Sequence, residues 1–169
     1  MTIVIAGGRR FISTEGTFEQ NMPIVIVGDK IVALDKDLSI ETRRTFEAIG
    51  KTVVASLMNP HGHFAWDVFF DLERQTCFDI PLGYIKYSRG FRAAVEAGVT
   101  TFRDLSCVRD TDSFARQVAR DGFLPGPTVY ACGRAVCRTG GHIWWGNREA
   151  DDPDEICRAV REQARGGAD

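Results

Sequence analysis

The stretch Val-Val-Ala-Ser-Leu-Met-Asn-Pro-His-Gly-His, residues 53–63, holds the pattern that decides the fold. An apolar run with β-branched residues at its start predicts a strand, and the run ends at His61 and His63. Residues i and i+2 of a strand point to the same face, so both imidazoles can reach one metal ion. Only three histidines occur in 169 residues, and two of them form this pair. The alternative interpretation is two strand histidines that make ordinary hydrogen bonds.

The residues before this stretch predict a small β layer. β-branched and apolar residues cluster there between turn formers, which is typical of short strands. Gly28-Asp29-Lys30 connects two of these clusters and contains a glycine that can take the positive φ of a hairpin turn. We therefore expect residues 1–55 to form part of a β-sandwich. The expected strands are 3–5, 24–27, 31–34, 45–49 and 52–54.

After residue 56 the pattern changes to strands that alternate with helices, which suits parallel βα units. Aromatic and apolar residues recur every three to four positions over 84–95, and Gly98 closes that predicted helix. Gly122 is a plausible left-handed end for a second helix. The expected elements are strands at 99–102 and 128–132 and helices at 84–95 and 111–120.

A third helix is predicted from its capping residues. Asp152 can cap the helix, Pro153 suits the first helical position, and Glu155 can return a hydrogen bond to the cap. Gly166-Gly167 ends the helix, and Ala168-Asp169 would begin a fourth strand.

Composition excludes several classes of protein. The chain is 44% hydrophobic and 26% charged, which is typical of a globular domain, and its net charge of -2 gives no electrostatic footprint for nucleic acid. No stretch has the ~20 apolar residues that a membrane helix needs, and the short apolar start does not make a signal peptide. We expect a cytoplasmic protein. Five scattered cysteines, with no Cys-x-x-Cys pair, predict free buried thiols.

With these elements in order, three segments together resemble the amidohydrolase superfamily, in its imidazolonepropionase-like and prolidase-like branch. Leu57-Met58-Asn59-Pro60-His61-Gly62-His63 is similar to the family's first barrel strand, and Ala97-Gly98-Val99-Thr100-Thr101-Phe102-Arg103-Asp104 to its second. Residues 126–142, ending in Thr139-Gly140-Gly141-His142, are similar to its third strand and the loop after it.

The resemblance implies an α/β fold in which a small β-sandwich part precedes a TIM-type (β/α)8 barrel. It also implies one or two zinc ions at the carboxyl ends of the strands, and hydrolysis of a C-N amide or dipeptide-like bond by metal-activated hydroxide. His61 and His63 would be metal ligands, and His142 would contact a small-molecule amide or peptide-like substrate. His142 is equally well interpreted as an anchor of its own loop.

The chain departs from the family pattern at Asn59, where the family has an aspartate. Asparagine keeps the hydrogen bonding of that position and loses its charge, so we expect reduced metal affinity. Asp104 and Asn59 are expected to contact the metal-binding residues and hold them in position. Asp104 is also expected to form a local ion pair with Arg103. Asp110 and Asp112 are interpreted as ordinary helix-start residues. Trp144 and Trp145 either wall a pocket or pack on other segments.

Residues 56–169 suffice for the first three βα units of a barrel, which needs ~250 residues when complete. None of the four lysines matches the family's bridging lysine, and no catalytic residue is assigned within this chain. We therefore expect the chain alone not to turn over substrate, because catalytic zinc normally has three protein ligands.

Two other functions stay open at this point. The chain could be a non-catalytic protein, derived from a truncated amidohydrolase, that binds a partner. It could instead be a small metal-binding module that adds a carboxylate such as Asp67 to the two histidines. The oligomeric state is open, and a homo-oligomer is possible.

Overall fold

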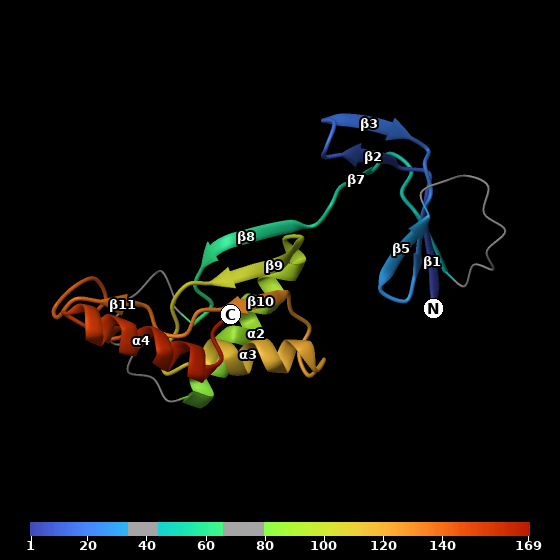
Figure 1. Cartoon of the computed structure of the whole chain (residues 1–169). Coiled ribbons are helices and arrows are strands. Elements are labelled where there is room, and N and C mark those ends of the chain that lie inside the picture. Colours follow the sequence, from blue (N-terminus) through green and yellow to red (C-terminus); the bar gives the residue numbers. More distant parts are fainter. Residues whose placement is uncertain (34–43, 66–79) are drawn as a thin grey trace. The chain divides into compact units, whose positions relative to one another are not determined.

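The computed structural model describes residues 1–33, 44–65 and 80–169 (Figure 1). The chain divides into two compact units, Met1–Ala55 and Ser56–Asp169. The predicted strand end at Leu34 and the carboxylate of Asp67 lie outside the described residues. None of the described helices is long and apolar enough to pass through a bilayer.

The described residues of the first unit form two sheets. The connection that contains Gly28 joins two antiparallel strands, with Gly28 at φ 65°, so the hairpin predicted there is confirmed. The four-stranded sheet has the order β5 (Lys30–Ala33), β4 (Ile24–Val27), β1 (Thr2–Ala6), β6 (Arg44–Glu47), and the three-stranded sheet has the order β3 (Thr17–Gln20), β2 (Arg9–Ile12), β7 (Thr52–Val53).

The hairpin β2–β3 is absent from the sequence-based expectations. Phe11 faces Phe18 across it, with ring centroids 5.0 Å apart, and Gly16 turns the chain at φ 68°. Cross-strand aromatic pairs of this kind stabilise an antiparallel ladder. The two phenylalanines on either side of a glycine were the available sequence indication.

The second unit confirms the predicted alternation of strands and helices. Its main sheet consists of three parallel strands in the order β10-β9-β8, and α2 and α3 pack against β9 and β10 (Figure 1). A short parallel pair, β11–β12, was not expected. The elements are β8 (Leu57–Gly62), α2 (Ile80–Glu96), β9 (Val99–Asp104), α3 (Thr111–Arg120), β10 (Thr128–Ala131), β11 (Val136–Cys137), β12 (Arg148–Glu149) and α4 (Pro153–Gly166).

An aromatic core fills the space between this sheet and its helices. Phe64 stacks on Phe102 with ring centroids 3.7 Å apart, and it meets Phe91 edge-on at 4.9 Å. Gly62 lies directly against the ring of Phe102, where an added Cβ would come within 2.1 Å of the ring's Cζ. The strand that carries the histidines therefore approaches the core more closely than any side chain at position 62 would allow.

The ends of α4 largely follow the prediction. The Glu155 N–H donates to Asp152 Oδ1 at 2.8 Å, and Gly167 takes a left-handed φ of 99°. The return hydrogen bond differs, because Glu155 Oε2 accepts from the N–H of Asp151 instead of from Asp152. After the helix, the Asp169 N–H donates to the carbonyl of Ala131 at the end of β10.

The four described cysteines are all free. Cys107 is buried, as predicted, whereas Cys157 is exposed on α4. The prediction of buried thiols is wrong for Cys157, because it occupies a solvent-facing position of that helix.

Candidate functional site

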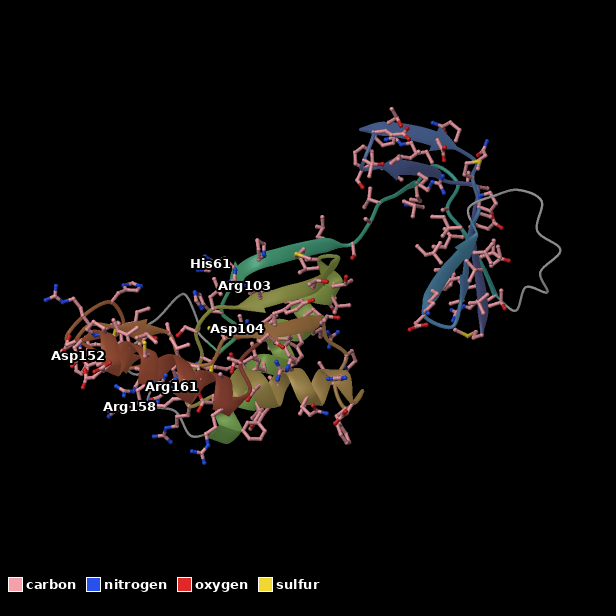
Figure 2. All side chains as sticks on the ribbon, in the orientation of Figure 1. His61, Arg103, Asp104, Asp152, Arg158 and Arg161 are labelled. Carbon is pink, nitrogen blue, oxygen red and sulfur yellow. The ribbon has the colours of Figure 1, made fainter. Side chains whose placement is uncertain are left out.

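His61 lies at the carboxyl end of β8 (Figure 2), and His63 follows the last residue of that strand. Their ring centroids are 5.4 Å apart and the rings are nearly perpendicular. His61 is exposed, and the His63 side chain keeps 29% of its surface exposed. The structure therefore brings the two imidazoles to one place, as their spacing predicts.

The strand is irregular just before the pair. Asn59 is paired with Phe102 and Gly62 with Asp104, so the register between β8 and β9 shifts within this short segment. Asn59 Oδ1 accepts a hydrogen bond from the His61 N–H at 3.1 Å. Asn59 thus supports the backbone of the histidine segment.

Asp104 ends β9 (Figure 2), and its carboxyl group lies near His63. Its side chain is completely buried, with Oδ1 4.0 Å from His63 Nδ1, and Oδ2 accepts a hydrogen bond from the Tyr87 hydroxyl at 3.1 Å. The predicted ion pair with Arg103 was wrong. Arg103 is exposed while Asp104 faces the interior, because consecutive strand residues point to opposite faces.

Burial changes the acid–base properties of both groups. Burial raises the pKa of Asp104 to about 7, helped by the charge of Asp112 and partly offset by the Tyr87 hydrogen bond. Burial lowers the pKa of His63, and the charges of His61 and His142 lower it further, against a backbone hydrogen bond with Ser106 that raises it. His63 therefore favours its neutral form, which is the form that binds a metal.

Asp112 lies in the first turn of α3, as predicted, but its environment is not that of an ordinary helix-start residue. It is completely buried, and its two oxygens accept hydrogen bonds from the Cys107 thiol at 3.0 Å, from the Ser113 N–H at 2.8 Å and from the Gly133 N–H at 2.7 Å. The carboxylate thus connects the start of α3 to the segment that follows β10. A buried carboxylate needs such partners, because an unpaired charge in the interior is costly.

His142 belongs to the loop 138–147, which joins β11 to β12. The side chain of His142 is exposed and lies within electrostatic range of His63. The loop is joined to the end of β9 through Asn147, which donates to the His142 carbonyl at 2.9 Å and accepts from the Ser106 hydroxyl at 2.9 Å. Sequence reasoning missed Ser106 and Asn147, because nothing local indicates a contact between residues 41 positions apart.

The two tryptophans follow His142 in the same loop. Trp144 is 48% exposed, Trp145 is half-buried, and their rings meet edge-on with centroids 6.0 Å apart. Trp144 therefore presents an aromatic surface to solvent next to His142.

Two imidazole nitrogens are suitable ligands for zinc, and their placement on one strand end fits part of a zinc site. Within residues 1–33, 44–65 and 80–169, no group of three or more His, Cys, Asp or Glu side chains could hold a metal ion. The described residues thus offer two imidazoles with one carboxyl group, that of Asp104, nearby.

Comparison with known proteins gives relatives over the whole chain, although no family model matches it. Ochratoxinase from Aspergillus niger is 28% identical over an alignment of 203 residues, which covers 99% of this chain and 40% of the ochratoxinase. The chain therefore spans less than half the length of this curated relative.

Solved structures match equally fully. A prolidase crystallised with N-methylphosphonate-L-proline superimposes with a TM-score of 0.88 at 23% identity, covering 99% of this chain and 45% of the prolidase. An amidohydrolase structure superimposes with a TM-score of 0.88 at 26% identity, covering the entire chain and 45% of that protein. The fold described above is thus the fold of the amino-terminal part of these hydrolases.

Proposed function

Since the chain belongs to the amidohydrolase superfamily over the part that it shares with these hydrolases, we propose that it carries the first two metal ligands of a metal-dependent enzyme. The reaction that we propose is hydrolysis of a C-N amide or dipeptide-like bond in a small molecule. The observation that supports this most directly is the approach of two imidazoles, 5.4 Å between ring centroids, at the carboxyl end of a parallel strand. Enzymes built on (β/α)8 barrels hold their active sites at that end of the strands.

His61 and His63 are proposed to hold a zinc ion. Bound zinc would lower the pKa of a coordinated water molecule to ~7. Asp104 is proposed to hold the ring of His63 in one orientation, because buried carboxylates behind metal-binding histidines fix the ring and its tautomer. Asn59 would keep the His61 backbone in place through the hydrogen bond at 3.1 Å.

The remaining ligands and the general base are proposed to come from residues other than those described. The described residues hold no group of three ligands, and two imidazoles leave a catalytic zinc one protein ligand short. His142 is proposed to contact the substrate, because its exposed side chain lies within electrostatic range of His63. The relatives are named for different activities, ochratoxinase and prolidase, so the substrate proposed here is the wider class of small amides.

The test uses the full-length protein, purified and dialysed against metal-free buffer. Elemental analysis is expected to find zinc or another divalent metal in stoichiometric amount, and His61→Ala and His63→Ala to lose most of it. Hydrolysis of a panel of N-acyl amino acids and dipeptides should fall at least ~100-fold in kcat/KM in both variants. His142→Ala is the matched control, since it should keep the metal and raise KM. Full metal content in the double variant His61→Ala, His63→Ala would refute the assignment.

A further inference from the structure

Ser106 follows the end of β9 and makes contacts in two directions. Ser106 is only 2% exposed, and its hydroxyl donates to Asn147 Oδ1 at 2.9 Å. Its backbone forms a hydrogen bond with His63. Ser106 thus contacts both a proposed metal ligand, His63, and Asn147 at the inner end of the loop 138–147, by which we mean the end next to β12.

Asn147 completes the connection with the other half of its amide. Nδ2 donates to the His142 carbonyl at 2.9 Å while Oδ1 accepts from Ser106. The two partners determine which way the amide faces, because a reversed amide would set its oxygen against the His142 carbonyl oxygen. An amide side chain satisfies both contacts, whereas an aspartate at this position would satisfy only the contact with Ser106.

The loop is held in a conformation that its sequence disfavours. Ile143, next to His142, has a left-handed φ of 53°, which is an outlier for a β-branched residue. The N–H groups of Gly146 and Asn147 both donate to the Ile143 carbonyl at 3.0 Å. Such backbone strain persists only where surrounding contacts over-determine the conformation.

The start of the loop, which follows β11, is held separately by two acidic residues in and just after β12. The Thr139 N–H donates to Asp151 at 2.9 Å, and the Gly140 N–H donates to Glu149 at 2.8 Å. The Ser106–Asn147 contact is therefore the side-chain connection, among the described residues, that ties the inner end of the loop to the strand end beside His63.

We propose that Ser106 and Asn147 are a positioning pair that fixes the distance between His142 and the pair His61 and His63. A substrate would then be selected by its length, measured from its scissile bond to the group that His142 contacts. This inference rests on the proposed function, because it assigns the loop to the same site. Neither residue touches the reacting atoms. Their effect is expected in substrate binding and selectivity, with the metal retained.

The test compares four variants with wild type in the full-length protein: Ser106→Ala, Asn147→Asp, Asn147→Ala and the double variant Ser106→Ala, Asn147→Ala. Metal content should stay at the wild-type level. KM should rise about tenfold or more with kcat changed less, because a displaced loop misplaces the substrate. Ranking the N-acyl amino acid and dipeptide panel by kcat/KM should give a flatter order of preference in the variants. Gln117→Ala removes an exposed hydrogen bond to Asp121 on α3 and is the matched control, with no change expected.

Two further readouts report on the loop without any turnover. Tryptophan emission should change in Asn147→Asp, since Trp144 and Trp145 lie in the loop. Hydrogen exchange at the amides of Gly141, Trp144 and Gly146 should quicken by about tenfold or more, because these N–H groups are bonded within the loop. The Ser106→Ala effect on exchange should be absent when Asn147 is already alanine, as for two residues that act through one contact.

The outcomes separate this inference from the proposed function. A wild-type protein without metal or amide hydrolysis would refute the proposed function, and the loop assignment to an active site would fail with it. Metal and hydrolysis in wild type with unchanged KM, substrate order and exchange in the variants would overturn the inference alone. Loss of metal and kcat together, without a change in KM, would also overturn it, because the pair would then act on His63 and not on the loop.

Discussion

The unit Met1–Ala55 and the unit Ser56–Asp169 differ in what they bury. Among the described residues of the first unit, the buried apolar side chains are Ile24, Val25 and Ala48, while Ile31 and Ile49 are more than 60% exposed. The second unit encloses an aromatic cluster in which Tyr87 and Phe91 are essentially inaccessible. Among the described residues, the second unit therefore has the larger buried interior, and the histidines lie at its edge.

The polar residues follow the same division. Every buried polar or charged side chain among the described residues lies in the second unit. Removal from water is what moves the pKa of a carboxyl upward and that of an imidazole downward. Among the described residues, the burial that alters these pKa values is therefore found in the second unit, next to its aromatic cluster. The buried polar residues are Asp104, Ser106, Thr111, Asp112 and Gln163.

The strongest test of this contrast removes one buried side chain from each unit. Phe91→Ala should lower the free energy of unfolding of the second unit by about 3–5 kcal/mol, because it leaves a large cavity. Val25→Ala is the matched change in the first unit and should cost about 2 kcal/mol. Denaturant unfolding followed by hydrogen exchange in each unit measures both losses. Losses of equal size would remove the contrast.

A second test uses the pH dependence of Asp104 in metal-free protein. Its pKa is about 7 in the folded state, against 3.8 for a solvated aspartate, so the folded state holds the proton more tightly. Stability should therefore fall as pH rises from about 4 to about 7, by up to about 4 kcal/mol at ~1.4 kcal/mol per pH unit. Asp104→Asn should abolish this slope while keeping an acceptor for Tyr87. The measurement is the free energy of unfolding of both proteins at a series of pH values, and the difference between them is compared with the expected slope.

His63 contributes with the opposite sign. Its lowered pKa means that stability is lost as pH falls below 6.5, the pKa of a solvated histidine, because the unfolded chain then binds the proton more readily. Subtracting the variant curve from the wild-type curve isolates Asp104 from this background. A variant with the same slope as wild type would contradict the assignment to Asp104.

The smallest of the three effects compares two glycines. Gly62→Ala should lower the free energy of unfolding by about 3 kcal/mol, because the new Cβ meets the Phe102 ring in a packed core. Gly16→Ala in the first unit meets no atom within 4 Å and should cost about 1 kcal/mol, from its positive φ alone. Thermal unfolding of the two variants measures the pair. An unchanged stability in Gly62→Ala would contradict this prediction, because it would show that the Phe102 ring can move aside.

Much of the second unit could be predicted from the sequence because its determinants are local. Helix periodicity, Gly98 and the Asp152 cap specify element ends within a few residues of themselves, and each matches the structure. The closeness of His61 and His63 also follows from strand geometry alone. In the first unit, the β4–β5 hairpin was equally local.

The remainder depends on contacts between distant residues. Local pattern indicates a neighbouring ion pair for Asp104 and a helix start for Asp112, and only the packed fold shows that both are completely buried. The Ser106–Asn147 contact likewise requires β9 and the loop before β12 to meet. A serine and an asparagine are too common in surface loops for their types to indicate such a contact.

The register shift between β8 and β9 has a consequence for how this sequence can change over time. Because the pairing of β8 with β9 changes register between Asn59 and Gly62, the number of residues in that segment determines which way the two imidazoles point. Exchange of one residue for another in that segment leaves this count intact, whereas loss or gain of a single codon would turn the histidines toward the wrong side. Among homologous genes, insertions and deletions between Asn59 and Gly62 should therefore be purged as strictly as changes of His61 itself.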